Sequence, residues 1–345
     1  MHPLLTIAVR AAREAGRVIL REIDRVDALE VTTKGRNDFV SEVDRRAEQA
    51  IITTVRRSYP DHAVLGEESG ADGAGDHVWV IDPLDGTTNY LHGFPVFAVS
   101  IAVKYRGKVE HGVVFDPLRN ELFTASRGRG AQLNNRRIRV SRRQGLDGAL
   151  LGTGFPFRDL AHLDVYLAIF RELITRTAGI RRAGSAALDL AYVACGRLDG
   201  FWEYGLKEWD MAAGTLLIQE AGGSVTDLEG SEAFLSTGNI VGGGLRVHGA
   251  ILEVVRRLGS RESRRPLAPE PGPEKPMAET TVQTPARPLP PEPSEPESAA
   301  GPPPLRKTTL SRKPRAANQA EKPGPRKPAK VTMRRSAAPS KPRRS

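Results

Sequence analysis

Apolar side chains recur every three or four residues near the start of the chain, a spacing that predicts an amphipathic helix. The residues on this face are Leu4, Leu5, Ala8, Ala11, Ala12, Ala15, Val18, Ile19 and Ile23. The same spacing returns after Ser41, where Ala47, Ala50, Ile51 and Val55 indicate a second helix. The intervening residues 31–44 are polar and contain a glycine, which predicts a loop with a hairpin-like segment.

After Gly70 the pattern changes to short β-branched or aromatic runs separated by Gly, Pro or Asn. These runs predict strands over residues 77–82, 97–105, 108–116 and 121–128. The second half returns to helical spacing, and helices are expected over residues 162–174, 185–196, 209–223 and 245–258. Short strands are expected between these helices. Strands and helices interleave without a strict βαβ repeat. This order favours a layered α/β or α+β sandwich over a barrel or a Rossmann fold.

The composition changes abruptly near Gly259. Residues 261–345 contain 19 Lys and Arg against 8 Glu, a net charge of +11, and 20 of the 26 prolines. The first 260 residues hold 32 basic and 33 acidic residues, a net charge of −1. Pro-rich sequence without aromatic residues cannot bury enough apolar surface to offset chain entropy. We therefore predict one folded domain, residues 1–259, followed by a disordered, Pro-rich, basic tail, residues 260–345.

Neither a disulfide scaffold nor a membrane segment is indicated. Cys195 is the single cysteine and lies in the apolar stretch "AYVACG", where a small buried hydrophobe is expected. Arg10, Arg13 and Arg17 interrupt the first apolar stretch, so it lacks the core of a signal peptide, and no run reaches membrane-spanning length. The sequence therefore predicts a cytoplasmic protein.

Candidate chemistry is concentrated in "WVIDPLDGTTN", residues 79–89, where an apolar strand runs into Asp82 and Asp85. Carboxylates at a strand end point into the space beyond it, and magnesium takes carboxylate and carbonyl oxygens while keeping several waters. Gly86 allows close backbone approach, and "GTTN" can begin a helix whose free N–H groups favour a phosphate. The simpler alternative is an Asp-Pro turn followed by a helix cap.

Three further acidic clusters occur elsewhere in the chain. "GEES" places Glu67 and Glu68 after the apolar "HAVL", and "DFVSEVD" places Asp38 and Asp44 just before the second helix. In "WEYGLKEWDMAAG", Asp210 precedes an alanine-rich helix. Each cluster has a plain alternative, either a solvated loop or a helix cap. The four clusters together favour a cation site.

These segments resemble the inositol monophosphatase superfamily, and most closely its SuhB-like bacterial branch. The resemblance covers about residues 3–258 and rests on "DFVSEVDRRAE", "GEES", "WVIDPLDGTTNYLHGFPVFAVSIA" and "RRAGSAALDLAYVACGRLDGFWEYGLKEWDMAAGTLLIQEAGG". It implies the α-β-α-β-α sandwich of inositol monophosphatases and fructose bisphosphatases. It also implies a homodimer that hydrolyses small phosphate monoesters, above all myo-inositol monophosphate, with Mg²⁺ as cofactor and inhibition by lithium.

The resemblance assigns two to three magnesium ions to the acidic clusters. Glu67, Asp82 and the carbonyl of Leu84 match the ligands of one ion. Asp82, Asp85 and Asp210 match those of a second, and Glu67 also matches the ligand of a weaker third ion.

The other roles follow in the same way. Asp44 and Thr87 match the pair that orients the attacking water, so with Glu67 they are the expected catalytic residues. Lys34 lies in what is a mobile loop over the site in the family. Substrate contacts are implied for Asp85, Gly86, Thr87 and Asp210 around the phosphate, and for Gly184, Ser185, Ala186 and Glu203 on the alcohol side.

Two alternatives stay open. Relatives of this fold cleave fructose bisphosphate, phosphoadenosine phosphate, NADP or histidinol phosphate, and one sequence does not choose among these substrates. Members of the same branch also act in ribosomal RNA transcription, so a regulatory role with RNA or the transcription machinery as partner is the second. Residues 306–345 hold 14 Lys and Arg against one Glu and would contact RNA through its phosphates. Because the first 260 residues are near neutral, the tail is expected to supply this affinity and to be dispensable for catalysis.

Overall fold

The computed structural model describes residues 2–23, 31–35, 38–156 and 160–262, without the side chains of residues 31–35, 38–40 and 260–262. All of them lie in one compact unit, Met1–Arg287, and a second unit, Pro288–Ser345, contains none of them. Beyond Glu262, the tail expected to be disordered lies outside the described residues.

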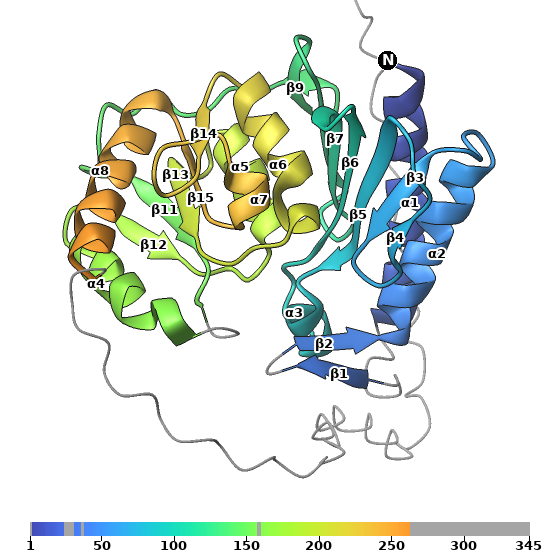
Figure 1. Ribbon diagram of the computed structural model, residues 1–345, viewed down its shortest axis with the longest axis horizontal. Helices are drawn as coiled ribbons and strands as arrows, with labels where there is room; N and C mark the ends of the chain where they lie inside the picture. The colour runs from blue at the N-terminus through green and yellow to red at the C-terminus, as the bar shows by residue number, and fades with distance from the viewer. Residues whose placement is uncertain (1, 24–30, 36–37, 157–159, 263–345) are drawn as a thin grey trace, which may run out of the picture. The chain divides into compact units, whose positions relative to one another are not determined.

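The described chain forms five alternating layers of helices and sheets (Figure 1). The outer layer at the N-terminal side contains helices α1 (Pro3–Glu22) and α2 (Glu42–Arg56). In the chain, the hairpin of β1 (Val31–Gly35) and β2 (Asp38–Ser41) lies between these two helices. The central layer contains α5 (Ala186–Ala194) and α6 (Glu208–Glu220). The outer layer at the other side contains α4 (Leu163–Ile174) and α8 (Leu245–Glu262). The expected α-β-α-β-α sandwich is confirmed.

The larger sheet separates the first helical layer from the central one. Its strands are β3 (Ala63–Gly66), β4 (Gly70–Asp72), β5 (His77–Asp85), β6 (Ala98–Tyr105), β7 (Lys108–Asp116), β8 (Glu121–Ser126), β9 (Gly130–Leu133) and β10 (Arg136–Arg137). They are ordered β10-β9-β8-β7-β6-β5-β3-β4, and neighbours are antiparallel except for β3 and β5. Within the described residues, this sheet supplies the strand ends that carry most of the predicted acidic residues.

The smaller sheet lies between the central helices and the last helical layer. Its strands are β11 (Leu150–Thr153), β12 (Gly179–Arg181), β13 (Gly200–Glu203), β14 (Ser224–Thr226) and β15 (Ile240–Gly243). The order is β12-β11-β13-β15-β14, with β11 parallel to both of its neighbours and the other pairs antiparallel. The short elements α3 (Thr87–Leu91), α7 (Phe234–Thr237) and a 3₁₀ turn (Leu160–His162) complete the described fold.

Alternation along the central strands explains why the larger sheet is covered on both faces. On β5, Trp79 and Ile81 pack against α1 and α2, whereas Val80 packs against the central helices. On β6, Val99 and Ile101 follow the first pattern. Because successive side chains of a strand point to opposite faces, an entirely apolar strand must have a cover on each side.

The central helix α6 is buried on all sides, as a helix between two sheets must be. A Cβ on Gly214 would lie 2.5 Å from the Cβ of Leu190, so the missing side chain lets α6 approach α5 closely. On the other side, a Cβ on Gly112 of β7 would lie 2.9 Å from the Ala213 carbonyl oxygen. Close packing on both faces fixes the start of α6, which carries Asp210.

The structure differs from the sequence-based expectation in β5. The strand was predicted to end at Asp82 but continues to Asp85, with a shift of register against β6 between these residues. Pro83 has no N–H to donate to a sheet ladder, so it favours this irregularity. Asp82 and Asp85 are therefore held by sheet backbone rather than by a turn. In the described part of the chain, no helix is long and apolar enough to cross a membrane.

Candidate active site

A cavity of about 750 Å³ is lined by residues from both sheets and from the helices next to them. Every predicted site residue with a described side chain lines it, except Asp44, which lies behind it. The lining residues among those predicted are Glu67, Asp82, Leu84, Asp85, Gly86, Thr87, Gly184, Ser185, Ala186, Glu203 and Asp210. The side chain of Lys34 lies outside the described residues. The structure thus brings together residues up to 143 positions apart in sequence.

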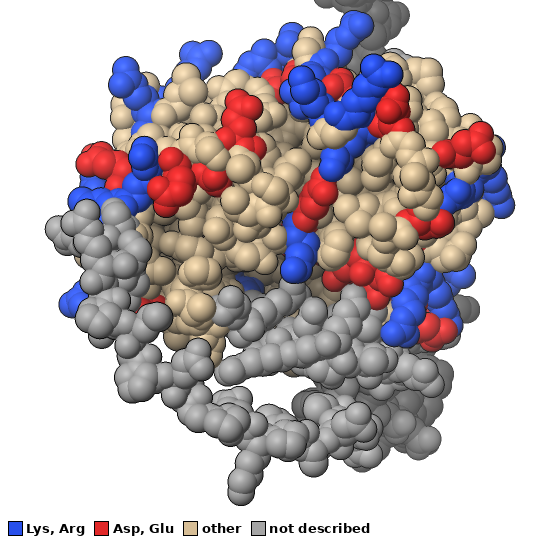
Figure 2. Space-filling model, viewed as in Figure 1, with Lys and Arg blue, Asp and Glu red and all other residues tan. Residues whose placement is uncertain are grey.

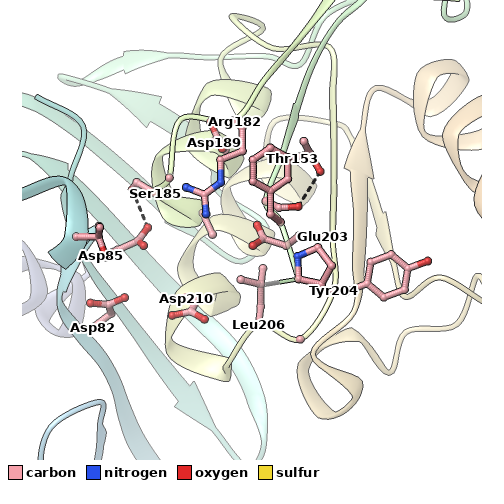
Figure 3. A pocket seen from close by; sticks show the side chains of 18 of the residues that line it. Asp82, Asp85, Thr153, Arg182, Ser185, Asp189, Glu203, Tyr204, Leu206 and Asp210 are labelled. Atoms are coloured by element: carbon pink, nitrogen blue, oxygen red, sulfur yellow. Dashed lines mark hydrogen bonds between the residues drawn. The ribbon is translucent and has the colours of Figure 1, made fainter. Parts of the chain in front are cut away.

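Four carboxylates form an acidic ring around one end of this cavity. Glu67 follows β3, Asp82 and Asp85 end β5, and Asp210 lies in the first turn of α6. Figure 3 shows Asp82, Asp85 and Asp210 facing the same space. The Asp82 side chain is the most enclosed, since the residue is 1% exposed, and it accepts a hydrogen bond from the Leu84 N–H at 2.9 Å.

Burial and like charges act on Asp82 in the same direction. Burial raises its pKa well above the ordinary value of an aspartate, and the negative charges of Glu67, Asp85 and Asp210 raise it further. The hydrogen bond from Leu84 opposes this shift. Additional positive charge in the cavity would therefore stabilise the ionised form of Asp82.

The loop that carries Glu67 is fixed by a residue that sequence reasoning did not single out. Glu48 of α2 is 3% exposed and accepts the backbone N–H groups of Glu68 at 3.0 Å and of Ser69 at 2.8 Å. The Glu67 N–H donates to the Ile81 carbonyl of β5 at 3.0 Å. These bonds hold the loop against both the helix and the strand. No local signal separates Glu48 from the exposed glutamates of an ordinary amphipathic helix.

Asp44 and Thr87 form a buried polar pair beside the acidic ring. The Thr87 hydroxyl lies 2.8 Å from Asp44 Oδ1 and 3.1 Å from the Leu84 carbonyl oxygen. Asp44 also accepts the N–H of Ser41 in a capping box at the start of α2. Asp44 thus caps α2, as the helix-cap alternative expects, and also accepts a hydrogen bond from Thr87. Burial is the main cause that raises the pKa of Asp44.

Asp85 connects the end of β5 in the larger sheet to the start of α5. Its Oδ2 atom accepts the Ser185 hydroxyl and the Ala187 N–H, both at 2.7 Å, at the start of α5 (Figure 3). Asn89 makes a second connection, because its amide nitrogen donates to the Ala183 carbonyl at 2.9 Å. These bonds fix the predicted alcohol-side residues relative to the acidic ring.

The opposite wall contains a second group of charges, of which only Glu203 was predicted. Asp189 of α5 is 2% exposed, and Figure 3 shows Arg182 between it and Glu203. Burial raises the pKa values of both carboxyl groups well above their ordinary values, and the positive charge of Arg182 offsets only part of this increase. A Cβ on Gly154 would lie 1.8 Å from a Glu203 oxygen, so only glycine leaves room for this carboxylate. Arg182 and Asp189 lie inside the recognised motif, but their side-chain directions depend on the packing of α5 on β11.

The acidic ring fits a hydrated cation rather than a metal ion held in a closed cage of side chains. In the described residues, no group of three or more His, Cys, Asp or Glu side chains is arranged so that it could hold a metal ion. Magnesium, however, is usually bound by one or two carboxylates and keeps several waters, so it does not require a closed cage. The buried Asp82 carboxylate, the nearby acidic groups and the Leu84 carbonyl therefore fit a hydrated hard cation by chemistry and charge.

We expect Asp82→Asn to raise the melting temperature of the metal-free protein at neutral pH. Asn keeps an oxygen that can accept the Leu84 N–H but removes a charge that the fold disfavours. An acid whose folded pKa is raised loses stability as pH increases from the unfolded pKa through the folded one. The gain should therefore shrink as pH falls toward the unfolded pKa of about 4 and vanish below it, where Asp82 is protonated in both states.

Calorimetry in EDTA measures this effect, which corresponds to about 2–4 °C for each kcal/mol in a domain of this size. Asp76→Asn is the matched control, because Asp76 is exposed and paired with Arg106. A lower melting temperature for Asp82→Asn than for wild type in EDTA at neutral pH contradicts the electrostatic account of the ring.

Comparison with known proteins identifies the relatives of this chain. The profile described as "Inositol monophosphatase family" matches residues 1–260. The chain is 60% identical over 262 residues to a protein of Pseudomonas aeruginosa named "Nus factor SuhB", covering 74% of this chain and 97% of that relative. A crystal structure of the extragenic suppressor protein suhB of Bartonella henselae has a TM-score of 0.72 and 44% identity, covering 74% and 99% of the two chains. An inositol monophosphatase structure from Anabaena (Nostoc) has a TM-score of 0.65 and 39% identity, covering 74% and 95%. The chain therefore belongs to the inositol monophosphatase family, within which it is similar to SuhB proteins.

Proposed function

We propose that this protein hydrolyses small phosphate monoesters in a magnesium-dependent reaction, with myo-inositol monophosphate as the preferred substrate. The observation that carries the proposal is the Asp82 carboxylate, whose pKa is raised by burial and further by three other acidic groups in the same cavity. Such a ring disfavours a phosphate dianion on its own and favours it once cations neutralise the carboxylates.

The residues that would hold the ions are those of the acidic ring, Glu67, Asp82, Asp85 and Asp210, with the Leu84 carbonyl. Magnesium supplies positive charge that stabilises phosphate oxygens and lowers the pKa of water. The predicted number, two to three ions, is part of the proposal. Asp85 has one oxygen engaged with α5, so its role includes fixing the distance between the ring and the substrate's alcohol side.

Asp44 and Thr87 are suited to orient a water molecule. When the Thr87 hydroxyl donates a hydrogen bond to Asp44 Oδ1, its oxygen lone pairs point away from Asp44 and can accept a hydrogen bond from water. Burial of Asp44 and its capping bonds to Ser41 keep this pair in one geometry. Gly86 has a φ of 99°, and backbone N–H groups at the start of α3 follow it directly, which fits the phosphate role inferred for Gly86 and Thr87.

The alcohol side of the cavity offers several hydrogen-bonding groups for a polyhydroxy ring. Glu203, Asp189 and Arg182 lie on the wall opposite the acidic ring, and the Ser185 hydroxyl lies between the two groups (Figure 3). Buried polar groups of this kind disfavour alcohols that cannot pair with them. This wall supports a sugar or cyclitol phosphate, and the name of the Anabaena relative favours inositol monophosphate among them. We also propose a cytoplasmic homodimer, as the family resemblance implies.

A panel of phosphate monoesters tests the function. We expect magnesium-dependent release of phosphate from inositol monophosphate and glycerol 2-phosphate, abolished by EDTA and inhibited by lithium. Fructose bisphosphate, phosphoadenosine phosphate, NADP and histidinol phosphate are the competing substrates. Metal-independent hydrolysis, or no hydrolysis of any ester in the panel, contradicts the proposal.

Within the same assay, Asp85→Asn should lower turnover by on the order of 100-fold or more, as removal of one group that stabilises developing charge usually does. The fold should persist, because Asn keeps one oxygen to accept from Ser185 or Ala187. Asp76→Asn, far from the cavity, is the control and should retain wild-type turnover. Near-wild-type turnover of Asp85→Asn at saturating magnesium would contradict the assignment of Asp85 to the magnesium site.

A second candidate function is regulatory, and the names of the relatives favour it. The Pseudomonas aeruginosa protein is named a Nus factor, which indicates a role in transcription for that protein. The tail after residue 260 has a net charge of +11 and is the first candidate for contact with RNA in this chain. The regulatory role and the phosphatase activity do not exclude one another.

Removal of the tail after Gly259 is expected to separate these functions. Because every proposed site residue lies between Lys34 and Asp210, turnover should stay within about a factor of two. RNA affinity at low salt should fall strongly, since each phosphate neutralised on a single strand contributes a slope of about −0.7 in log affinity against log salt. Loss of turnover would show that the tail supports the site, and unchanged RNA affinity would show that the tail is not the contact.

A further inference from the structure

Arginines are concentrated in one stretch of the folded domain, although its net charge is near zero. Residues 127–143 contain seven arginines, no lysine and no acidic residue. The seven are Arg127, Arg129, Arg136, Arg137, Arg139, Arg142 and Arg143, all of them exposed. Without this stretch, the rest of the first 260 residues is distinctly acidic. The near-zero net charge therefore results from a basic stretch and an acidic remainder that cancel, not from a lack of charged residues.

The fold places this stretch along one side of the domain. It begins in the turn between β8 and β9, passes through the β9–β10 hairpin and crosses from the larger sheet toward β11. Figure 2 shows Lys and Arg side chains crowded on the side that carries β9 in Figure 1. We call residues 127–143 the arginine ridge.

Local packing turns the arginines outward. Ile138 and Val140 are half-buried against the central core, and Ile138 donates its N–H to the Ala131 carbonyl of β9 at 3.0 Å. In an extended segment neighbouring side chains point to opposite faces, so Arg137 and Arg139, on either side of Ile138, face outward. A Cβ on Gly130 would lie 2.9 Å from the Arg137 guanidinium, which places that group over the β8–β9 turn.

The two ends of the ridge are paired with acids, whereas its middle is not. Arg127 lies 3.2 Å from Glu110, and Arg143 lies 3.3 Å from Asp199. Arg129, Arg136, Arg137, Arg139 and Arg142 make no ion pair with any acidic side chain in the described ranges. The nearby Glu220 carboxylate accepts the backbone N–H groups of Gly128 and Gly130, both at 2.7 Å, instead.

Protection of a sheet edge explains only part of this arrangement. β10 is an edge strand, and charged residues on an edge prevent pairing with another sheet. Arg136 and Arg137 serve that purpose, since they are the two residues of β10. Arg129, Arg139 and Arg142 lie outside β10, so protection of the edge does not account for them. Five unpaired like charges on one surface favour binding of an extended anion.

We propose that the arginine ridge binds the phosphate backbone of a nucleic acid. The exclusive use of arginine points to phosphate, because the planar guanidinium can bind two phosphate oxygens at once. The chain's own basic tail has the same sign of charge and is repelled. No aromatic residue occurs between Arg127 and Arg143, so the contact carries no base stacking and is independent of base sequence.

This inference goes beyond the phosphatase proposal and does not depend on it. None of the ridge arginines lines the cavity, so nucleic-acid binding and phosphate release are separate measurements. It also adds a candidate source of attraction within the domain, whose near-neutral net charge led to the expectation that the tail supplies the affinity. That expectation used the net charge of 260 residues, whereas binding depends on the local field at one surface.

The test uses the full chain and a protein ending at residue 262, because solved relatives that consist almost entirely of this region fold without a tail. The ridge variant replaces Arg129, Arg136, Arg139 and Arg142 by Gln. The control variant replaces four exposed arginines on other elements by Gln, namely Arg10, Arg45, Arg171 and Arg246. Fluorescence anisotropy measures affinity for a single-stranded RNA and for poly-glutamate at several salt concentrations.

The tail-less protein should bind the RNA at low salt, and the ridge variant should lower that affinity at least about tenfold and reduce the salt slope by up to about three. The control variant should change affinity by less than about twofold. Melting temperature and phosphate release should be unchanged in both. If the quadruple variant does not fold, Arg139→Gln with Arg142→Gln replaces it and should give about half of the loss in slope.

Three results overturn the proposal. The first is absence of RNA binding by the tail-less protein at low salt. The second is an equal loss of affinity in the ridge and control variants, which would indicate general attraction by charge. The third is binding of poly-glutamate as tight as that of RNA and equally sensitive to the ridge variant, which would assign the surface to an acidic protein.

Discussion

The rest of the site depends on the burial of the Asp82 carboxylate among like charges. A buried charge normally neutralises or finds a partner, because its desolvation is costly. Asp82 cannot move away from Glu67, Asp85 and Asp210, since β5 is covered on both faces and α6 is packed between two sheets. Rigid layers thus hold the acidic ring in an arrangement that repulsion alone would disperse. A site of this kind exchanges some stability of the empty protein for strong preference for cations.

Contacts between the end of the larger sheet and the start of α5 determine which substrates this ring can act on. Asp85 bonds to Ser185 and Ala187, and Asn89 bonds to the Ala183 carbonyl, so the wall with Arg182 is placed relative to the ring by short, direct hydrogen bonds. Orientation of a substrate between two fixed walls contributes to catalysis independently of the chemistry at phosphorus. The same connection explains why residues from both halves of the sequence are needed for one cavity.

Much of the fold and of the acidic ring could be predicted from the sequence, because period and motif are local properties. The β-branched and aromatic run of β5 and the helical spacing before Glu22 identify elements without knowledge of their neighbours. Glu48 and Asp189 could not be identified in this way, since their roles depend on which loop or wall lies opposite them in the folded chain. The continuation of β5 to Asp85 was missed because Asp-Pro ordinarily ends a strand. The arginine ridge was missed because net charge averages over a surface that the fold divides.

Anomalous diffraction from crystals soaked in manganese would show whether the acidic ring is a cation site. Manganese prefers the same oxygen donors as magnesium and can be located by its own scattering. We predict anomalous density in contact with the Asp82 carboxylate and with at least one other member of the ring. Density elsewhere in the domain, or none at saturating manganese with an intact fold, would contradict the account.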